Sequence, residues 1–303
     1  MTGAVDPAWI AVDWGTSNLR AWAMGADGRV LAEATSDDGM GRLPREGFEP
    51  ALLRLISPWL SERPPVVACG MVGSRQGWCE VPYRTVPCPP LDRDALALAP
   101  VTDPRLQVSI APGLKQVQPA DVMRGEETQI AGVLRLMPGY DGVICLPGTH
   151  SKWAHVSAGE VVSFQTFMTG ELFALLSEQS VLRHGMQGDG WDDAAFDTGV
   201  SDALSRPERI GARLFALRAE GLIVGLSPQA ARARLSGLLI GIELAAAKPY
   251  WLGQRVTLVG AETLSAAYAR ALAAQGVEAP RLSATDCTLA GLASLSPETE
   301  AAR

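Results

Sequence analysis

The segment DWGTSNLR at residues 13–20 links an apolar run at 9–14 to a second one at 19–24, and it is the strongest feature of the sequence. A turn of small residues between two strands exposes backbone N–H groups, and a glycine without Cβ lets phosphate oxygens approach closely. An aspartate at the end of a buried strand can also hold Mg²⁺ through water. We therefore expect a phosphate site made by Asp13, Gly15, Thr16, Ser17 and Arg20. An ordinary hairpin, in which Asp13 and Thr16 cap backbone groups, is the alternative.

This pattern of strands, a Gly-Thr turn and a helix occurs twice. The first copy has expected strands at 9–14, 19–24, 30–34 and 66–69 and an expected helix over 52–60. The second has expected strands at 143–146, 152–156 and 161–168 and an expected helix over 171–182. The Gly-Thr pairs at 15–16 and 148–149 fall at matching points of the two copies. Such a repeat predicts two similar α/β domains that face each other, with both turns at one cleft.

The other segments are less regular. We expect a proline-rich loop at 82–104, a helix over 126–137, a Gly/Asp-rich loop at 185–210, a helix over 235–247, a strand at 256–259, and a helix that carries Leu264, Tyr268 and Leu272. The apolar run at 235–247 is interrupted by Glu243, so no membrane span is predicted there.

Composition limits the function classes. The 303 residues include 26 Lys+Arg against 33 Asp+Glu, a net charge of −7, with 47% apolar and 19% charged residues. These values are typical of a soluble globular protein and give no reason to expect binding to nucleic acid or to an anionic membrane. The N-terminus has no basic region followed by an apolar core, so no signal peptide is predicted. The 5 cysteines form no CxxC pair, which favours reduced thiols in a cytoplasm. A homodimer is compatible with the sequence, which does not fix the oligomeric state.

Side chains that often bind metals do not form a metal motif in this sequence. The histidines at 150, 155 and 184 lack the spacing of a ligand set, and we expect His155 to be structural. The aspartates at 189, 192, 193 and 197 lack the spacing of a calcium loop, so we expect a solvated loop there. No Walker A, GxSxG or protein-kinase signature occurs in the chain.

Three motifs in order resemble the sugar-kinase branch of the actin/hexokinase/Hsp70 ATPase superfamily. DWGTSNLRAW (13–22) looks like its first phosphate motif, PGTHSKW (147–153) its second, and LVGAETLSAAY (258–268) its adenosine motif. ACGMVGSRQGW (68–78), VMRGEETQI (122–130) and FMTGELFALL (167–176) sharpen the match, because they resemble the 2-dehydro-3-deoxygalactonokinase family. The resemblance implies an α/β fold of two ribonuclease-H-like domains, each a mixed five-stranded sheet with flanking helices, with the nucleotide in the interdomain cleft.

The resemblance also implies an activity and a domain division. Members of the family phosphorylate a 2-keto-3-deoxy sugar acid on O6 with ATP and Mg²⁺. We therefore expect a cytoplasmic transferase of galactonate catabolism that acts on the terminal hydroxyl of 2-dehydro-3-deoxy-D-galactonate. The domains would be a sugar-acid and phosphate-binding domain at 1–125 and an ATP-binding domain at 126–303, joined near 120–140. The alternatives are a kinase of the same fold that acts on another sugar acid or polyol, and a non-catalytic regulator that senses ATP or sugar.

Nucleotide and base residues follow from the motifs. The resemblance implies that these residues contact ATP: Gly148, Thr149, His150 and Ser151 of the second phosphate motif, and Gly260, Ala261 and Glu262 of the adenosine motif. Larger carbohydrate kinases carry their catalytic Asp where this chain has Glu126. A carboxylate in the first turn of a helix stays ionised because the helix dipole favours it, so Glu126 can accept a proton. The alternatives are that Glu126 only favours a helix start, or that Asp13, or less favourably Asp121, is the base.

The sugar acid is expected at the end of the strand over 66–69. The residues predicted to bind it are Gly73, Ser74, Arg75 and Trp78. Arg75 is predicted to hold the carboxylate, because a guanidinium is a planar two-pronged donor for that group. A solvated surface arginine is the alternative for Arg75, and packing in the core is the alternative for Trp78.

Overall fold

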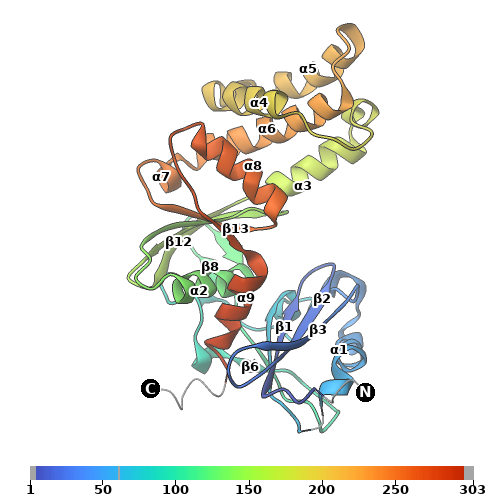
Figure 1. Ribbon diagram of the computed structural model, residues 1–303, viewed down its shortest axis with the longest axis vertical. Helices are drawn as coiled ribbons and strands as arrows, with labels where there is room; N and C mark the ends of the chain where they lie inside the picture. The colour runs from blue at the N-terminus through green and yellow to red at the C-terminus, as the bar shows by residue number, and fades with distance from the viewer. Residues whose placement is uncertain (1–4, 61, 297–303) are drawn as a thin grey trace. The chain divides into compact units, whose positions relative to one another are not determined.

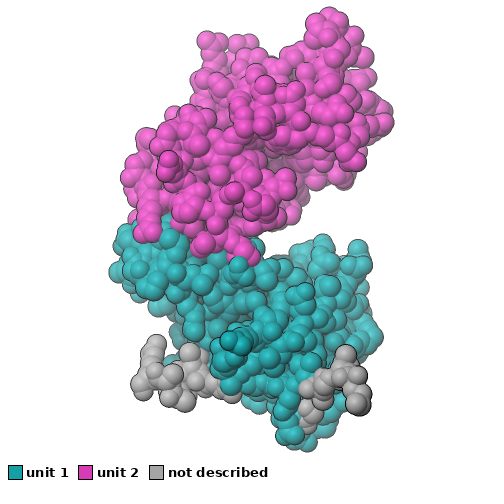
Figure 2. Space-filling view, in the orientation of Figure 1, with its two compact units in different colours: residues 1–141, 156–163, 284–303 teal, residues 142–155, 164–283 magenta. Residues whose placement is uncertain are grey.

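The computed structural model describes residues 5–60 and 62–296. Contacts between residues divide the chain into two compact units, coloured teal and magenta in Figure 2. Unit 1 comprises Met1–Asp141, Val156–Ser163 and Ala284–Arg303, and unit 2 comprises Gly142–His155 and Phe164–Ser283. This division differs from the boundary expected at 125/126, because the helix that follows this point and the C-terminal segment both pack within unit 1.

Unit 1 is built on a sheet with the strand order β3-β2-β1-β4-β7-β6. Its strands are β1 (Trp9–Trp14), β2 (Leu19–Met24), β3 (Val30–Ser36), β4 (Val66–Gly70), β6 (Ala97–Leu98) and β7 (Val108–Ile110). Strands β1, β2 and β3 are antiparallel neighbours, whereas β4 runs parallel to β1 and β7 parallel to β4. The sheet has six strands instead of the expected five, because the short β6 adds to its edge next to β7.

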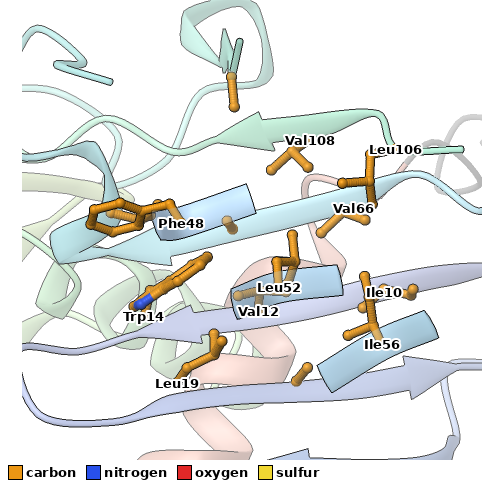
Figure 3. Close-up of a cluster of buried hydrophobic side chains, with 14 of the residues drawn as sticks. Ile10, Val12, Trp14, Leu19, Phe48, Leu52, Ile56, Val66, Leu106 and Val108 are labelled. Atoms are coloured by element: carbon orange, nitrogen blue, oxygen red, sulfur yellow. The ribbon is translucent and has the colours of Figure 1, made fainter. Parts of the chain in front are cut away.

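Helices cover both faces of this sheet, which is why β1 is apolar along nearly its whole length. On one face, α1 (Phe48–Ile56) packs on a buried cluster that includes Trp14, drawn in Figure 3. On the other face, Leu292 of α9 (Ala284–Ala293) packs with Trp9 and Trp22.

Helix α2 (Glu126–Leu136) lies against α9 (Figure 1). Their backbones approach so closely that a Cβ at Gly132 would lie 1.8 Å from the carbonyl oxygen of Cys287. A Cβ at Gly291 would lie 2.0 Å from the carbonyl oxygen of Thr128. These two glycines hold the C-terminal helix on α2, so a division by sequence order alone cannot describe the units.

The segment expected as a loop at 82–104 contains the two short strands β5 (Arg84–Thr85) and β6 and a single turn of 3-10 helix at Arg93–Ala95. Strand β5 pairs with the hairpin of β8 (Leu114–Gln116) and β9 (Asp121–Met123) in a three-stranded sheet. The hairpin leads directly into α2, and thereby positions the start of that helix.

A second sheet, which belongs to unit 2 except for residues 156–163, repeats the order of the first five strands of unit 1. Its order is β12-β11-β10-β13-β14. The strands are β10 (Gly142–Leu146), β11 (Ser151–Ser157), β12 (Glu160–Phe167), β13 (Val256–Gly260) and β14 (Arg281–Ser283). In both sheets, the first three strands of the copy lie in the spatial order third, second, first. Two further strands then extend the sheet beside the first strand and run parallel to it, which is the ribonuclease-H-like arrangement. The α/β fold expected from the repeat is therefore confirmed.

The helices of unit 2 are α3 (Thr169–Ala174), α4 (Asp193–Ser205), α5 (Ile210–Ile223), α6 (Pro228–Ala246), α7 (Lys248–Trp251) and α8 (Glu262–Ala273). Figure 1 shows α4 and α5 beside α6. None of the helices in the described part of the chain has the length and apolar character needed to cross a membrane.

The loop expected at 185–210 is wrong for half of its length, because α4 occupies 193–205. Its Gly and Asp residues have structural uses. Asp192 caps the helix by accepting a hydrogen bond from the N–H of Ala195 at 2.9 Å, and Asp197 pairs with Arg270 of α8. A Cβ at Gly199 would lie 2.5 Å from the carbonyl oxygen of Arg234, so this glycine allows α4 to pack closely on α6.

Candidate active site

Unit 2 contains a pocket of about 1010 Å³, large enough for a nucleotide. Residues that the sequence assigned to two separate motifs line it together: Gly148 and Thr149 of the second phosphate motif, and Ala261 of the adenosine motif. Trp191 and Phe173 contribute apolar surface to its wall. The pocket therefore combines a small-residue turn with apolar surface, the two features that a nucleotide's phosphates and base need.

The turn at 147–151 joins β10 to β11 at the edge of this pocket. No described atom outside the chain neighbours of Gly148 lies within 4 Å of the position that its Cβ would take, so the backbone is open there. Behind the turn, α3 packs so closely that a Cβ at Gly170 would lie 2.4 Å from the carbonyl oxygen of Gly148. The N–H of Glu171 donates to the carbonyl of Thr149 at 3.0 Å, and the Glu171 carboxylate meets Nε2 of His150 at 2.5 Å. The first turn of α3 thus fixes the turn at 147–151, which we call the phosphate turn after the sequence motif that contains it.

Ser151 supports the same turn from the interior. It is fully buried, and its Oγ accepts a hydrogen bond from the N–H of Gly148 at 3.4 Å and lies 2.8 Å from the hydroxyl of Tyr268. This differs from the expected direct contact of Ser151 with phosphate, because the hydroxyl is turned away from the pocket surface. The side chain instead links the turn to α8.

Glu243 of α6 completes this network. Its carboxylate accepts hydrogen bonds from Trp153 Nε1 at 2.7 Å, from the Tyr268 hydroxyl at 2.7 Å and from the Thr169 hydroxyl. Burial raises the pKa of Glu243, and the three donors oppose that shift. A buried carboxylate with three donors joins β11, α3 and α8 behind the phosphate turn. Sequence reasoning missed this role, although a single charged residue in the apolar run 235–247 was a signal for it.

The adenosine motif lies beside the phosphate turn because of Gly260. A Cβ there would lie 3.3 Å from the carbonyl oxygen of Pro147 and 3.0 Å from Ser265 Oγ, so a small residue lets β13 end next to the turn. Ala261 lines the pocket. Glu262 is directed elsewhere, because its carboxylate pairs with Arg281 at 2.6 Å and its side chain is 82% exposed. The expected nucleotide contact by Glu262 therefore has no support in the geometry.

In unit 1, Asp13 lies at the end of β1, opposite Arg20 of β2 and Cys69 of β4. Arg20 Nη2 donates to Asp13 Oδ2, and Arg20 Nη1 donates to the hydroxyl of Thr285 at 3.3 Å. The guanidinium predicted to contact phosphate is therefore engaged with Asp13 and neutralises part of its charge.

The turn after Asp13 is held from behind. The N–H of Met40 donates to the carbonyl of Gly15 at 3.0 Å, and the N–H of Gly41 donates to the carbonyl of Thr16 at 2.9 Å. Thr16 and Ser17 are exposed. The turn therefore presents two side-chain hydroxyls on a fixed backbone, as a phosphate site requires.

The start of α2 lies near the end of β1. Gly125 has a φ of +107°, and its Cβ position lies 3.4 Å from the Cα of Gly70, which pairs with Trp14 beside Asp13. The fold thus brings the two candidate bases, Asp13 and Glu126, to the same edge of one sheet. Both lie in unit 1.

The two glutamates at the start of α2 differ in how deeply their carboxylates are buried. Glu126 is half-buried, and its Oε2 accepts a hydrogen bond from the N–H of Arg124 at 3.0 Å. Glu127 is fully buried and accepts from the N–H of Gly125 at 2.9 Å and 2.8 Å. Burial, with a further contribution from the charge of Glu126, raises the pKa of Glu127 to about 8. A base must reach its substrate, so the geometry favours Glu126 over Glu127 for that role.

The predicted sugar-acid segment is divided between surface and core. Arg75 is exposed, whereas Gly73, Ser74 and Trp78 are buried. The ring of Trp78 lies 6.1 Å from that of Trp14 and is stacked on Phe48 at 6.4 Å. We correct the assignment of Trp78, because a ring that is 3% exposed packs in the core and cannot stack on a sugar.

Within residues 5–60 and 62–296, no three His, Cys, Asp or Glu side chains converge as a metal site. Mg²⁺ in phosphate-transfer sites is commonly held by one or two carboxylates, with phosphates and water completing its shell. The partly exposed carboxylate of Asp13 fits that mode of binding.

Comparisons with known proteins bear on the whole chain. The sequence model of the 2-keto-3-deoxy-galactonokinase family matches residues 13–295. A probable 2-dehydro-3-deoxygalactonokinase of Rhizobium meliloti (strain 1021) is 38% identical over 94% of this chain and 95% of its own length. The 2-dehydro-3-deoxygalactonokinase of Escherichia coli (strain K12) is 35% identical over 95% of this chain and 97% of its own length.

A crystal structure shares the fold. It is of a Sinorhizobium meliloti protein assigned to the same kinase activity, with a TM-score of 0.88 and 37% identity, and the match covers 95% of this chain and 97% of that one. Family motifs, relatives and fold agree over nearly the full length. The chain belongs to the 2-keto-3-deoxy-galactonokinase family.

Proposed function

We propose that the protein transfers the γ-phosphoryl group of ATP to the terminal, O6 hydroxyl of 2-dehydro-3-deoxy-D-galactonate, as a cytoplasmic step of galactonate catabolism. The observation that carries the proposal is the pocket of unit 2, where the second phosphate motif and the adenosine motif meet in a member of this kinase family. The two relatives named above carry the name of this activity.

ATP would bind in the pocket of unit 2. Its base would lie against the apolar wall near Trp191 and Ala261, and its phosphates would lie at Gly148 and Thr149. The open backbone at Gly148 leaves room for phosphate oxygens, and the hydrogen bonds from α3 and Ser151 keep the turn in place. A preorganised turn does not have to be ordered during the reaction, which is how such sites stabilise developing charge.

The acceptor would bind in unit 1. Glu126 would accept the proton of the attacking hydroxyl, because its carboxylate is partly exposed and lies in the first turn of α2, where the helix dipole favours the ionised form. Gly15, Thr16 and Ser17 would offer N–H and hydroxyl donors to phosphate oxygens. Asp13 would hold Mg²⁺, which when bound neutralises phosphate charge. Catalysis would come mainly from positioning and charge neutralisation.

A coupled ADP-release assay tests the proposal. The purified protein is given ATP and Mg²⁺ with 2-dehydro-3-deoxy-D-galactonate, with its gluconate-derived epimer, with a neutral polyol, or with no acceptor. We expect ADP release only with a sugar acid, fastest with the galactonate-derived one, and none when EDTA removes Mg²⁺. Release with the polyol alone indicates a kinase of different specificity. ATP binding without release under any condition indicates a regulator. Size-exclusion chromatography of the same sample determines whether the chain is a homodimer.

A further inference from the structure

Arg124 is a buried cation with unused hydrogen-bonding capacity. It lies between β9 and α2 and is 8% exposed. Its Nη2 donates to the carbonyl oxygen of Val81 at 2.7 Å. Its other two nitrogens, Nε and Nη1, are buried and have no hydrogen-bond partner among the described residues. Buried polar groups are nearly always paired in folded proteins, so two unpaired donors on one charged group require an explanation.

The guanidinium also lacks a carboxylate partner. None of its nitrogens forms an ion pair with an acidic side chain in the described part of the chain, although Glu126 and Glu127 follow closely in sequence. Its plane lies over the ring of Tyr83, with 4.2 Å between Cζ and the ring centre, which fixes the orientation of the side chain. The charge of Arg124 lowers the pKa of Glu127, but burial raises that pKa to about 8, so Glu127 supplies little negative charge at neutral pH. A buried charge with so little compensation destabilises a fold, and an anionic ligand would supply the missing counter-charge.

A second unpaired donor lies in the neighbouring loop. Ser74 is 4% exposed, and its hydroxyl is buried without a partner among the described residues. The preceding residue touches Arg124, because a Cβ at Gly73 would lie 2.8 Å from Nη1. The N–H of Val81 in turn donates to the carbonyl of Gly73 at 2.9 Å. The loop after β4 and the segment before α2 therefore place three unpaired donor atoms, on two side chains, in one neighbourhood.

We infer that Arg124, assisted by Ser74, binds the carboxylate of the sugar acid, the role that the sequence analysis gave to Arg75. The inference rests on the proposed function, which supplies a substrate with one anionic end. The three donor atoms are buried in the structure without ligand, so the carboxylate has to displace the loop after β4 to reach them. Once bound there, it is shielded from the water that screens the charge of the exposed Arg75. The backbone N–H of Arg124 bonds to Glu126, whereas its guanidinium bonds to Val81. The same residue thus connects the proposed base with a charge that can anchor the opposite end of the acceptor.

The test compares Arg124→Met with wild type and with the exposed control Arg29→Met, using the sugar acid and its uncharged C1 amide as acceptors. Wild type and Arg29→Met should prefer the acid. In Arg124→Met the KM for the acid should rise by about 30- to 1000-fold, the KM for ATP should stay within about threefold, and the preference for the acid over the amide should disappear. A structural role would instead change the kinetics of acid and amide alike.

Thermal unfolding without substrate gives a readout independent of activity. Removing a buried charge that has no ion-pair partner should leave the Tm of Arg124→Met unchanged or higher. The sugar acid should raise the Tm of wild type and of Arg29→Met but not that of Arg124→Met. If Arg124→Met does not fold, Gly73→Ala replaces it. Its added methyl group displaces the guanidinium end and should raise the KM for the acid at least about tenfold, with a smaller effect on the amide.

The outcomes are distinct. If Arg124→Met or Gly73→Ala folds and keeps the preference for the acid, the inference is overturned and buried water is the partner of these donors. Loss of that preference in Arg75→Met, with Arg124→Met unaffected, overturns it in favour of Arg75. If wild type phosphorylates no sugar acid at all, the proposed function fails, and the inference fails with it.

Discussion

Tyr268 and Ser265 offer a matched test of the network behind the phosphate turn. Both hydroxyls lie on α8 and are buried. The Tyr268 hydroxyl bonds to Glu243 at 2.7 Å and to Ser151 at 2.8 Å, whereas Ser265 Oγ has no partner among the described residues. Tyr268→Phe and Ser265→Ala each remove one oxygen from the same helix, but only the first removes hydrogen bonds.

The magnitude follows from those bonds. A net intramolecular hydrogen bond contributes about 1 kcal/mol, and a buried partner left unsatisfied costs about 1–3 kcal/mol. Tyr268→Phe deprives both Glu243 and Ser151 of a partner, so the free energy of unfolding should fall by about 2–4 kcal/mol. Ser265→Ala removes a group that is already unsatisfied, so its unfolding free energy should stay within about 0.5 kcal/mol of wild type or rise.

Native-state hydrogen exchange of the amides in β10, β11 and α8 measures this difference in unit 2 by itself. Because Ser151 also holds the N–H of Gly148, Tyr268→Phe should raise the KM for ATP several-fold and leave the KM for the sugar acid unchanged. Equal exchange protection in Tyr268→Phe and Ser265→Ala would show that the bonded hydroxyl of Tyr268 contributes nothing to the stability of unit 2.

Three further predictions use the other site residues. Glu126→Gln keeps the size of the side chain but cannot accept a proton, so kcat should fall about 10²–10⁴-fold at nearly constant KM. Glu127→Gln, at the buried neighbour, should keep kcat within a few-fold of wild type, and equal losses in both variants would argue against Glu126 as the base. Gly148→Val should fold like wild type, because no described atom beyond its chain neighbours lies within 4 Å of its Cβ position. The larger side chain should raise the KM for ATP at least about tenfold, and unchanged ATP binding in calorimetry would show that the nucleotide does not bind at this turn. Burial raises the pKa of Glu127 from 4.5 to about 8, so the folded state keeps a proton that the unfolded state releases, and stability should fall as pH rises through this window. Glu127→Gln mimics the protonated form and should flatten that fall in unfolding measured at each pH, whereas an unchanged slope would show that Glu127 is not its source.

Much of the fold could be predicted because its signals are local. The apolar run at 9–14, the turn after Asp13 and the strands around 147–151 have the period and turn residues of their structures. The structure confirms these strands and the repeat that they form. It does not confirm the loop at 185–210, although the Gly and Asp residues there are typical of a loop in sequence. In the fold, Gly199 lies within α4 and lets that helix pack closely on α6.

The site was only partly predictable, because burial and pairing depend on residues far apart in the chain. Sequence alone leaves Trp78 a candidate for both the core and the sugar site, and only the fold shows that it packs on Trp14 and Phe48. Likewise, the carboxylate of Glu243 is satisfied by residues up to 90 positions away, and no local pattern encodes this. The unpaired donors of Arg124 become visible only once Val81 and Tyr83 surround it.

The chemical structure of the product shows which hydroxyl receives the phosphoryl group. The protein is incubated with ATP, Mg²⁺ and 2-dehydro-3-deoxy-D-galactonate, and the product is examined by phosphorus NMR with coupling to protons. We expect one phosphate ester, formed in equal amount to ADP, whose phosphorus couples to the two protons of the terminal methylene group. A phosphate ester on a secondary carbon, or ADP formed with no ester at all, would contradict it.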